Sequence, residues 1–229
     1  IMLINFIKYS RLIHNISSFV VNLIPFFIFH NLSKYNEIRK ALFNLGIDSI
    51  EGDYLEFGVF TGSTINHALN IYSKTIRKYK QNRKFYGFDS FEGFPEEVHS
   101  EFTSKKFQSD YNFVKKLEKK HPVKCKIIKG YFEESLQNKE LENEITNIAL
   151  VFIDCDIYKS AIPCIKFIKK KLSHGSYIIV DDCHNIDQNG KSILNALEEN
   201  LDVYNNLKLI GFYGVSGMIY RYFKTTPIN

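Results

Sequence analysis

Short strand-like segments alternate with helical segments along most of this chain of 229 residues. Their residues predict strands at about 53–58, 84–89, 124–129, 148–154 and 177–181, and helices at about 63–80, 110–121 and 158–172. The segment 148–154 is apolar throughout, which is typical of a strand buried on both faces of a sheet. His174 and Gly175 are expected to turn the chain into the fifth strand. This alternation predicts an α/β fold with a doubly wound, mostly parallel sheet.

The two ends of the chain depart from this alternation. After a helix at about 190–200, two strands at about 207–213 and 217–223 are joined by Gly-Val-Ser-Gly, which predicts an antiparallel terminal hairpin. Near the other end, residues 33–46 predict a helix with Ser33 as its N-cap and Gly46 just after its last turn. We therefore divide the chain into an N-terminal helical extension, residues 1–48, and an α/β domain, residues 49–229.

Residues 1–30 are strongly apolar, but Lys8, Arg11, His14 and Pro25 interrupt the pattern. The longest clean run is shorter than the ~20 residues that a bilayer-spanning helix needs, and no small-residue cleavage site indicates a signal peptide. We favour a helical arm that packs on the domain or on a second subunit, and we expect a homo-oligomer. The alternative is a segment that rests on a membrane surface. Both interpretations suit a cytoplasmic protein, in the second case one at the inner face of the membrane.

Charge and cysteine content narrow the classes of partner. The net charge of +5 is modest, and the basic residues are scattered among acidic ones. A nucleic-acid-binding protein would concentrate its basic residues in a stripe with aromatics between them, so we expect no nucleic-acid partner. The four cysteines form no Cys-x-x-Cys pair, and we expect them to be reduced, with packing explaining them as well as zinc would.

A glycine-containing turn follows the first predicted strand. Glu56 ends that strand, Gly58 and Gly62 follow four residues apart, and a helical pattern starts at Ser63. Glycines let a ligand approach the backbone closely, and a helix N-terminus offers free N–H groups. Alone this pattern is weak evidence, because a glycine turn can simply join a strand to a helix.

Acidic residues stand at the carboxyl ends of four of the five strands: Glu56, Asp89, Asp154 with Asp156, and Asp181 with Asp182. Ligands of open α/β sheets bind along that edge. Six carboxylates gathered there raise one another's pKa unless a cation or the donors of a ligand compensate them. A helix N-cap would explain Asp181 or Asp182 alone, but it does not explain the whole set.

The spacing assigns these acids two tasks. Asp89 is placed to accept the hydroxyls of a ribose. The turn before it lacks the Gly-x-Gly-x-x-Gly pattern that binds a diphosphate, which argues against NAD. An acidic turn without that pattern better suits S-adenosylmethionine, which has an amine and a ribose but no phosphate. The second group consists of Asp154, Asp156, Asp181 and Asp182, whose oxygen ligands suit Mg²⁺.

Five sequence blocks resemble the macrocin O-methyltransferase (TylF/MycF) family. In order they are Glu56-Phe-Gly-Val-Phe-Thr-Gly62, Phe88-Asp-Ser-Phe-Glu-Gly-Phe-Pro95, Gly130-Tyr-Phe-Glu-Glu-Ser-Leu136, Ile153-Asp-Cys-Asp-Ile-Tyr-Lys-Ser160 and Val180-Asp-Asp182. They span roughly residues 50–223, and the second and fourth are fairly specific. The resemblance implies a Rossmann-like class I methyltransferase that uses S-adenosylmethionine and methylates sugar hydroxyls of natural products or surface glycans.

The resemblance also implies roles for individual residues. It implies cofactor contacts from Glu56, Gly58, Thr61, Gly62, Ser63, Asp154 and Asp89, the last on the ribose, with Ser90, Gly130, Tyr131 and Phe132 near the adenine. It implies a divalent metal, which we expect to be Mg²⁺, on Asp154 or Asp156 together with Asp181 and Asp182. The next two residues, Cys183 and His184, depart from the bulky aromatic and small residue expected there.

We therefore expect an O-methyltransferase in which Mg²⁺ assists by lowering the pKa of a sugar hydroxyl. Candidates for the base that takes the proton are Asp156, an aspartate of the fifth strand such as Asp182, and His184. The loop 91–109 is expected to act as a lid, with Phe91, Phe94, Phe102 and Phe107 against the substrate.

Other functions remain as alternatives at this stage. A small phenolic acceptor is one, because metal-dependent enzymes of that kind place acids similarly. A nucleotide-dependent oxidoreductase is another, although the missing diphosphate glycine pattern argues against it. A non-catalytic binding or membrane-associated scaffold would fit the apolar N-terminus, but the full set of acids argues against a pocket without activity.

Overall fold

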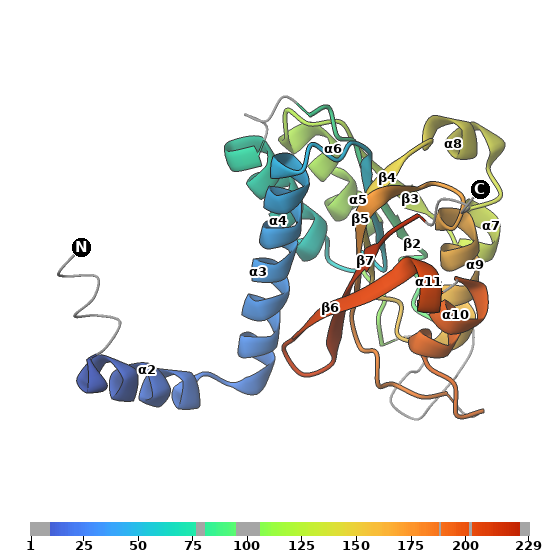
Figure 1. Cartoon of the computed structure of the whole chain (residues 1–229). Helices are drawn as coiled ribbons and strands as arrows, with labels where there is room; N and C mark the ends of the chain where they lie inside the picture. Colours follow the sequence, from blue (N-terminus) through green and yellow to red (C-terminus); the bar gives the residue numbers. More distant parts are fainter. Residues whose placement is uncertain (1–9, 77–80, 95–105, 188, 202, 225–229) are drawn as a thin grey trace, which may run out of the picture.

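A seven-stranded sheet forms the centre of the protein (Figure 1). The computed structural model describes residues 10–76, 81–94, 106–187, 189–201 and 203–224. The strands are β1 (Asp53–Phe57), β2 (Phe85–Asp89), β3 (Cys125–Lys129), β4 (Ile148–Ile153), β5 (Leu172–Val180), β6 (Leu207–Tyr213) and β7 (Gly217–Tyr222). Their order is β3-β2-β1-β4-β5-β7-β6. The first five are mutually parallel, and β7 runs antiparallel to both of its neighbours.

The strand order confirms the predicted doubly wound sheet with its antiparallel hairpin. The chain proceeds outward from β1 through β2 to β3 and then returns to place β4 on the other side of β1. The order therefore reverses between β1 and β4, and a ligand is expected beyond the carboxyl ends of those two strands. β4 is buried along its whole length, as its apolar sequence predicts.

Helices cover both faces of the sheet (Figure 1). One face is covered by α3 (Phe26–Ile47), α4 (Ser63–Ile71), a π-helical turn (Tyr72–Ile76), α5 (Tyr111–Lys115) and α6 (Leu117–Lys120). The other is covered by α7 (Phe132–Ser135), α8 (Lys139–Glu144), α9 (Tyr158–Ile168) and α10 (Ile193–Asn200), and the short α11 (Val203–Asn206) leads into β6. Successive residues of β1 serve the two layers, since Tyr54 packs into the first and Leu55 into the second.

Several expected boundaries differ from the observed ones. α3 begins at Phe26, seven residues before the expected N-cap, and Pro25 is its N-cap, a position where the missing N–H of proline breaks no helical hydrogen bond. The turn expected at residues 174–175 is wrong, since β5 already begins at Leu172 and Gly175, with φ +82°, lies within it. The register with β4 shifts there, as in a β-bulge. The helix expected over 110–121 is split into α5 and α6.

The N-terminal helix α2 (Arg11–Leu23) projects away from the rest of the protein (Figure 1). None of its residues is buried, whereas α3 packs on the sheet through Ile38, Leu42 and Leu45. Within the described part of the chain, no single helix has the length and apolar character to cross a membrane. Only α2 and α3 together meet that requirement, as a pair bent by 112°.

Candidate active site

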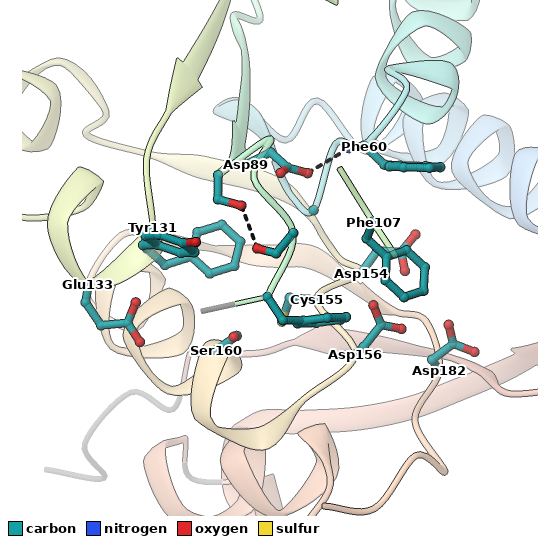
Figure 2. A pocket seen from close by; sticks show the side chains of 15 residues that line it. Phe60, Asp89, Phe107, Tyr131, Glu133, Asp154, Cys155, Asp156, Ser160 and Asp182 are labelled. Carbon is teal, nitrogen blue, oxygen red and sulfur yellow. Dashed lines mark hydrogen bonds between the residues drawn. The ribbon is translucent and has the colours of Figure 1, made fainter. Parts of the chain in front are cut away.

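A hollow of about 860 Å³, measured out to its open mouth, lies at the carboxyl ends of the parallel strands (Figure 2). It is lined by Gly58, Phe60, Asp89, Ser90, Gly93, Phe94, Phe107, Tyr131, Phe132, Glu133, Asp154, Cys155, Asp156, Ser160 and Asp182. Figure 2 shows Tyr131 and Glu133 at one end and Asp154, Asp156 and Asp182 at the other. The hollow therefore lies where the reversal of strand order predicts a ligand.

Asp89 at the end of β2 holds the glycine turn in place. One carboxylate oxygen accepts hydrogen bonds from the backbone N–H groups of Val59 (2.8 Å) and Phe60 (2.7 Å), and the other accepts one from Phe91 (2.7 Å). Burial raises the pKa of Asp89, and the three N–H groups counteract that rise. A carboxylate has about four acceptor positions, so the side chain retains one for a hydroxyl group in the hollow.

Asp154, Asp156 and Asp182 form a compact acidic group. One oxygen atom of each lies within 4.8 Å of the others. Burial raises the pKa of Asp154 to about 7, and burial together with the charge of Asp154 raises the pKa of Asp156 well above its ordinary value. Asp156 and Asp182 also have positive φ angles, 59° and 45°, a strained conformation that is common at functional sites.

Asp181, which the resemblance implied as a metal ligand, does not belong to this group. It is 1% exposed and accepts a hydrogen bond from Lys34 Nζ of α3 at 2.8 Å, while His30 Nε2 lies 3.2 Å from the same carboxylate oxygen. Burial alone would raise the pKa of Asp181, but the hydrogen bond to His30 and the charge of Lys34 outweigh it and lower that pKa to about 2. Lys34 Nζ also lies 3.4 Å from Asp154 Oδ2. The predicted set of Asp154, Asp181 and Asp182 is therefore divided by a lysine.

Other predicted site residues lie outside the lining of the hollow: Glu56, Thr61, Gly62, Ser63, Gly130 and His184. Glu56 is fully buried, accepts a hydrogen bond from the Tyr54 hydroxyl at 2.5 Å, and has its pKa raised to about 8 by burial. Its other oxygen has no hydrogen-bond partner among the described residues. His184 is exposed and lines a different hollow, beside the β6–β7 turn. The roles of these residues stay predictions.

Some lining residues were not predicted: Phe60, Gly93, Glu133, Cys155 and Ser160. All five fall inside the resembling blocks, and Phe60 lies between the two glycines of the first block. Membership of those blocks was therefore an available signal, but it did not indicate which side chains face the hollow. Of the expected lid phenylalanines, Phe94 and Phe107 line the hollow with their rings in edge contact at 5.3 Å, and Phe102 lies outside the described residues.

Residues 32–217 match the family model described as Macrocin-O-methyltransferase (TylF). No curated protein is significantly similar to the chain in sequence. The chain resembles the crystal structure of the calicheamicin methyltransferase CalS11, also described as a TDP-rhamnose 3'-O-methyltransferase, with a TM-score of 0.70 and 20% identity over 97% of this chain and 91% of CalS11. For the O-methyltransferase NovP the TM-score is 0.62, with 18% identity over 84% of this chain and 80% of NovP. An O-methyltransferase from Bacillus cereus, solved in complex with SAH, has a TM-score of 0.52 and 13% identity over 82% of this chain and 81% of its own. At these identities the structural likeness establishes the fold alone.

Proposed function

The chain belongs to the macrocin O-methyltransferase (TylF) family of S-adenosylmethionine-dependent enzymes, and we propose that its acceptor is a hydroxyl group of a sugar. The observation that carries the proposal is that Asp89 and the acidic group of Asp154, Asp156 and Asp182 border one hollow. One part of the hollow suits an adenosyl group, and the other suits a hydroxyl that must lose a proton. CalS11, described as acting on TDP-rhamnose, supports a sugar acceptor.

The residues on the cofactor side suit a nucleoside. Asp89 retains an acceptor position for a ribose hydroxyl, and Gly58 lines the hollow at the end of β1. Tyr131 and Phe132 supply aromatic faces on which a base can stack. S-adenosylmethionine, when bound, supplies the activated methyl group.

The residues on the acceptor side suit a polyhydroxylated molecule. We assign Asp156 the role of accepting the hydroxyl proton, because its carboxylate lines the acceptor end of the hollow beside Asp154 and Asp182. The Ser216 hydroxyl donates to Asp182 Oδ1 at 3.0 Å and orients that carboxylate. Phe94 and Phe107 form an apolar wall that helps to exclude water from the hollow.

The acidic group also fits a divalent cation by its donor chemistry. Three carboxylates at this mutual distance offer the hard oxygen ligands that Mg²⁺ prefers. We assign Asp154 and Asp182 to such an ion, which leaves Asp156 to take the proton. A bound Mg²⁺ supplies Lewis acidity that lowers the pKa of an acceptor hydroxyl.

Thermal unfolding with added ligands tests the cofactor assignment. S-adenosylhomocysteine should raise the melting temperature, because a ligand that binds only the folded state stabilises it, and NAD⁺ should not. Asp89→Asn should weaken the stabilisation, since an amide accepts fewer hydrogen bonds than a carboxylate. Stabilisation by NAD⁺ alone would favour the oxidoreductase, and stabilisation by neither ligand would favour the non-catalytic alternative.

Transfer of labelled methyl groups tests the acceptor. The purified protein is incubated with labelled S-adenosylmethionine and either nucleotide-linked sugars, glycans or catechols, with and without EDTA. We expect label on a sugar-containing acceptor. Label on catechols alone would replace the sugar proposal by the phenolic alternative.

We further propose that α2 lies on an anionic membrane surface. Its large apolar side chains are exposed, among them Leu12 (68%) and Phe19 (63%), which lie seven residues apart and so share one face of the helix. The sequence has no acidic residue before Glu37, whereas Lys8 and Arg11 are basic. Apolar side chains on one face and net positive charge are the features of an interfacial helix.

Sedimentation with lipid vesicles tests this contact. The full chain should sediment with phosphatidylglycerol-containing vesicles and much less with neutral phosphatidylcholine vesicles. Replacing Leu12 and Phe19 by glutamate should abolish sedimentation while methyl transfer is retained, because these residues are remote from the hollow. The contrary outcome is that the wild type stays in solution as a dimer while the double variant is a monomer. In that case a second copy of the chain covers α2, and the membrane proposal is wrong.

A further inference from the structure

Lys34 of the N-terminal helix α3 lies buried beside the acidic group. It is 9% exposed, and its ammonium nitrogen lies 2.8 Å from Asp181 Oδ2 and 3.4 Å from Asp154 Oδ2. The same nitrogen stands 5.7 Å from the centre of the Phe152 ring. Lysine is almost never so deeply buried unless it is paired. Here its ammonium group bridges the carboxyl ends of β4 and β5, the strands whose acids were predicted to bind a metal.

The ammonium group of Lys34 is a fixed positive charge. Burial alone would lower the pKa of Lys34, but the charges of Asp154 and Asp181 outweigh burial and raise that pKa above its ordinary value. The pairing is supported from the same helix, because His30 contacts Asp181 through Nε2 and accepts a hydrogen bond from the Val215 N–H through Nδ1, at 3.1 Å. α3 is thereby tied to both β5 and the β6–β7 turn.

We infer that Lys34 is an internal counter-cation that occupies the position between Asp154 and Asp181 where a divalent metal ion would otherwise bridge them. An ion coordinated by these two carboxylates would need their oxygens at 2.0–2.1 Å for Mg²⁺. The ammonium contacts the same two side chains, so its bulk and its charge both oppose such an ion. In the wild-type protein, Asp181 is therefore not available to a metal ion, and the carboxylates left for one belong to the group of Asp154, Asp156 and Asp182.

This inference rests on the proposed function for the meaning of the acidic group, but its test does not need the reaction. If Lys34 served only to attach α3 to the sheet, removing its charge would lower stability and leave metal affinity unchanged. If Lys34 excludes the metal, removing its charge opens a site between Asp154 and Asp181. Metal affinity therefore separates the two roles.

The test is Mn²⁺ binding to the full chain, measured by the electron paramagnetic resonance signal of free Mn²⁺. We expect Lys34→Met and Lys34→Gln to bind Mn²⁺ at least about tenfold more tightly than the wild type, since a repelling charge is removed a few ångströms from the ion. The glutamine variant retains a hydrogen-bond donor for Asp181, so it keeps the test possible if the methionine variant does not fold. Lys40→Met is the matched control, because Lys40 lies on the same helix, is exposed, and pairs with Glu37.

A double variant identifies the ligand that becomes available. Lys34→Met combined with Asp181→Asn should lose the gain in affinity, because the second carboxylate is gone. Unchanged Mn²⁺ affinity in both Lys34 variants, or a gain that persists in the double variant, would overturn the inference. Variants that fold only when Mn²⁺ is present support it, whereas variants that fold neither with nor without Mn²⁺ show a structural role and contradict it. S-adenosylhomocysteine binding, measured in parallel, reports separately on the proposed function.

Discussion

Asp156→Asn should lower kcat for methyl transfer by about 10²–10⁴-fold, the usual contribution of a positioned general base. The amide has nearly the same shape as the carboxylate but does not take up a proton at neutral pH. Because Asp156 lies at the acidic end of the hollow, away from Tyr131, S-adenosylhomocysteine should bind the variant about as well as the wild type (Figure 2). The effect should therefore appear in kcat rather than in cofactor affinity.

Asparagine is the informative replacement because of the backbone at this position. Asp156 has φ +59°, a left-handed conformation that asparagine tolerates and most other residues do not. Alanine would add backbone strain to the loss of the base, and the two effects would be mixed. Asp156→Asn should therefore keep the melting temperature of the wild type, or exceed it, because one of three closely spaced carboxylates is removed.

The measurement is single-turnover methyl transfer to the acceptor found in the labelling assay. Glu134→Gln is the matched control, since it makes the same chemical change at an exposed acid that does not line the hollow. A loss smaller than about tenfold in Asp156→Asn would assign proton removal to another group. In that case the same replacement at Asp182, the remaining candidate that lines the hollow, is the next variant.

The sheet could be predicted because its signals are local. Apolar runs such as 148–154 identify buried strands, and regular alternation with helices restricts the topology to parallel crossovers. The bulge in β5 could not be predicted in this way. Gly175 is a turn signal in its own sequence context, yet Leu172 and Tyr177, on either side of it, both pair with β4, which keeps it within a strand.

The site was only partly predictable for a related reason. Acids after strands indicate which edge of the sheet binds ligands, and Asp89, Asp154, Asp156 and Asp182 do border the hollow. Asp181 and Asp182 are neighbours in sequence, but successive side chains at a strand end point in opposite directions. Asp181 therefore contacts Lys34, 147 residues earlier in the chain. No local sequence pattern can predict a partner at that separation.

Gly58→Ala should lower the free energy of unfolding by about 4 kcal/mol or more, a loss that single substitutions cause only through severe steric or strain defects. Gly58 has φ +90°, and a Cβ atom there would lie 1.8 Å from the carbonyl oxygen of Asp154. That oxygen belongs to a backbone segment which is itself fixed, because the Asp154 N–H donates to Phe57 O at 2.8 Å. On the other side, the Gly58 N–H donates to Phe88 O at 2.9 Å. A methyl group at residue 58 must therefore separate β1 from β4 at the point where the strand order reverses.

Gly190→Ala is the matched control for this prediction. Gly190 has φ +74°, but a Cβ atom there would meet nothing within 4 Å, so the substitution adds only backbone strain, about 1–2 kcal/mol. Urea unfolding followed by circular dichroism gives the free energy of unfolding of both variants. The difference between them isolates the contact with Asp154, and equal losses of stability would contradict it. Because the same displacement would move Asp154 away from Asp156 and Asp182, Gly58→Ala should also lose S-adenosylhomocysteine binding and methyl transfer, while Gly190→Ala keeps both.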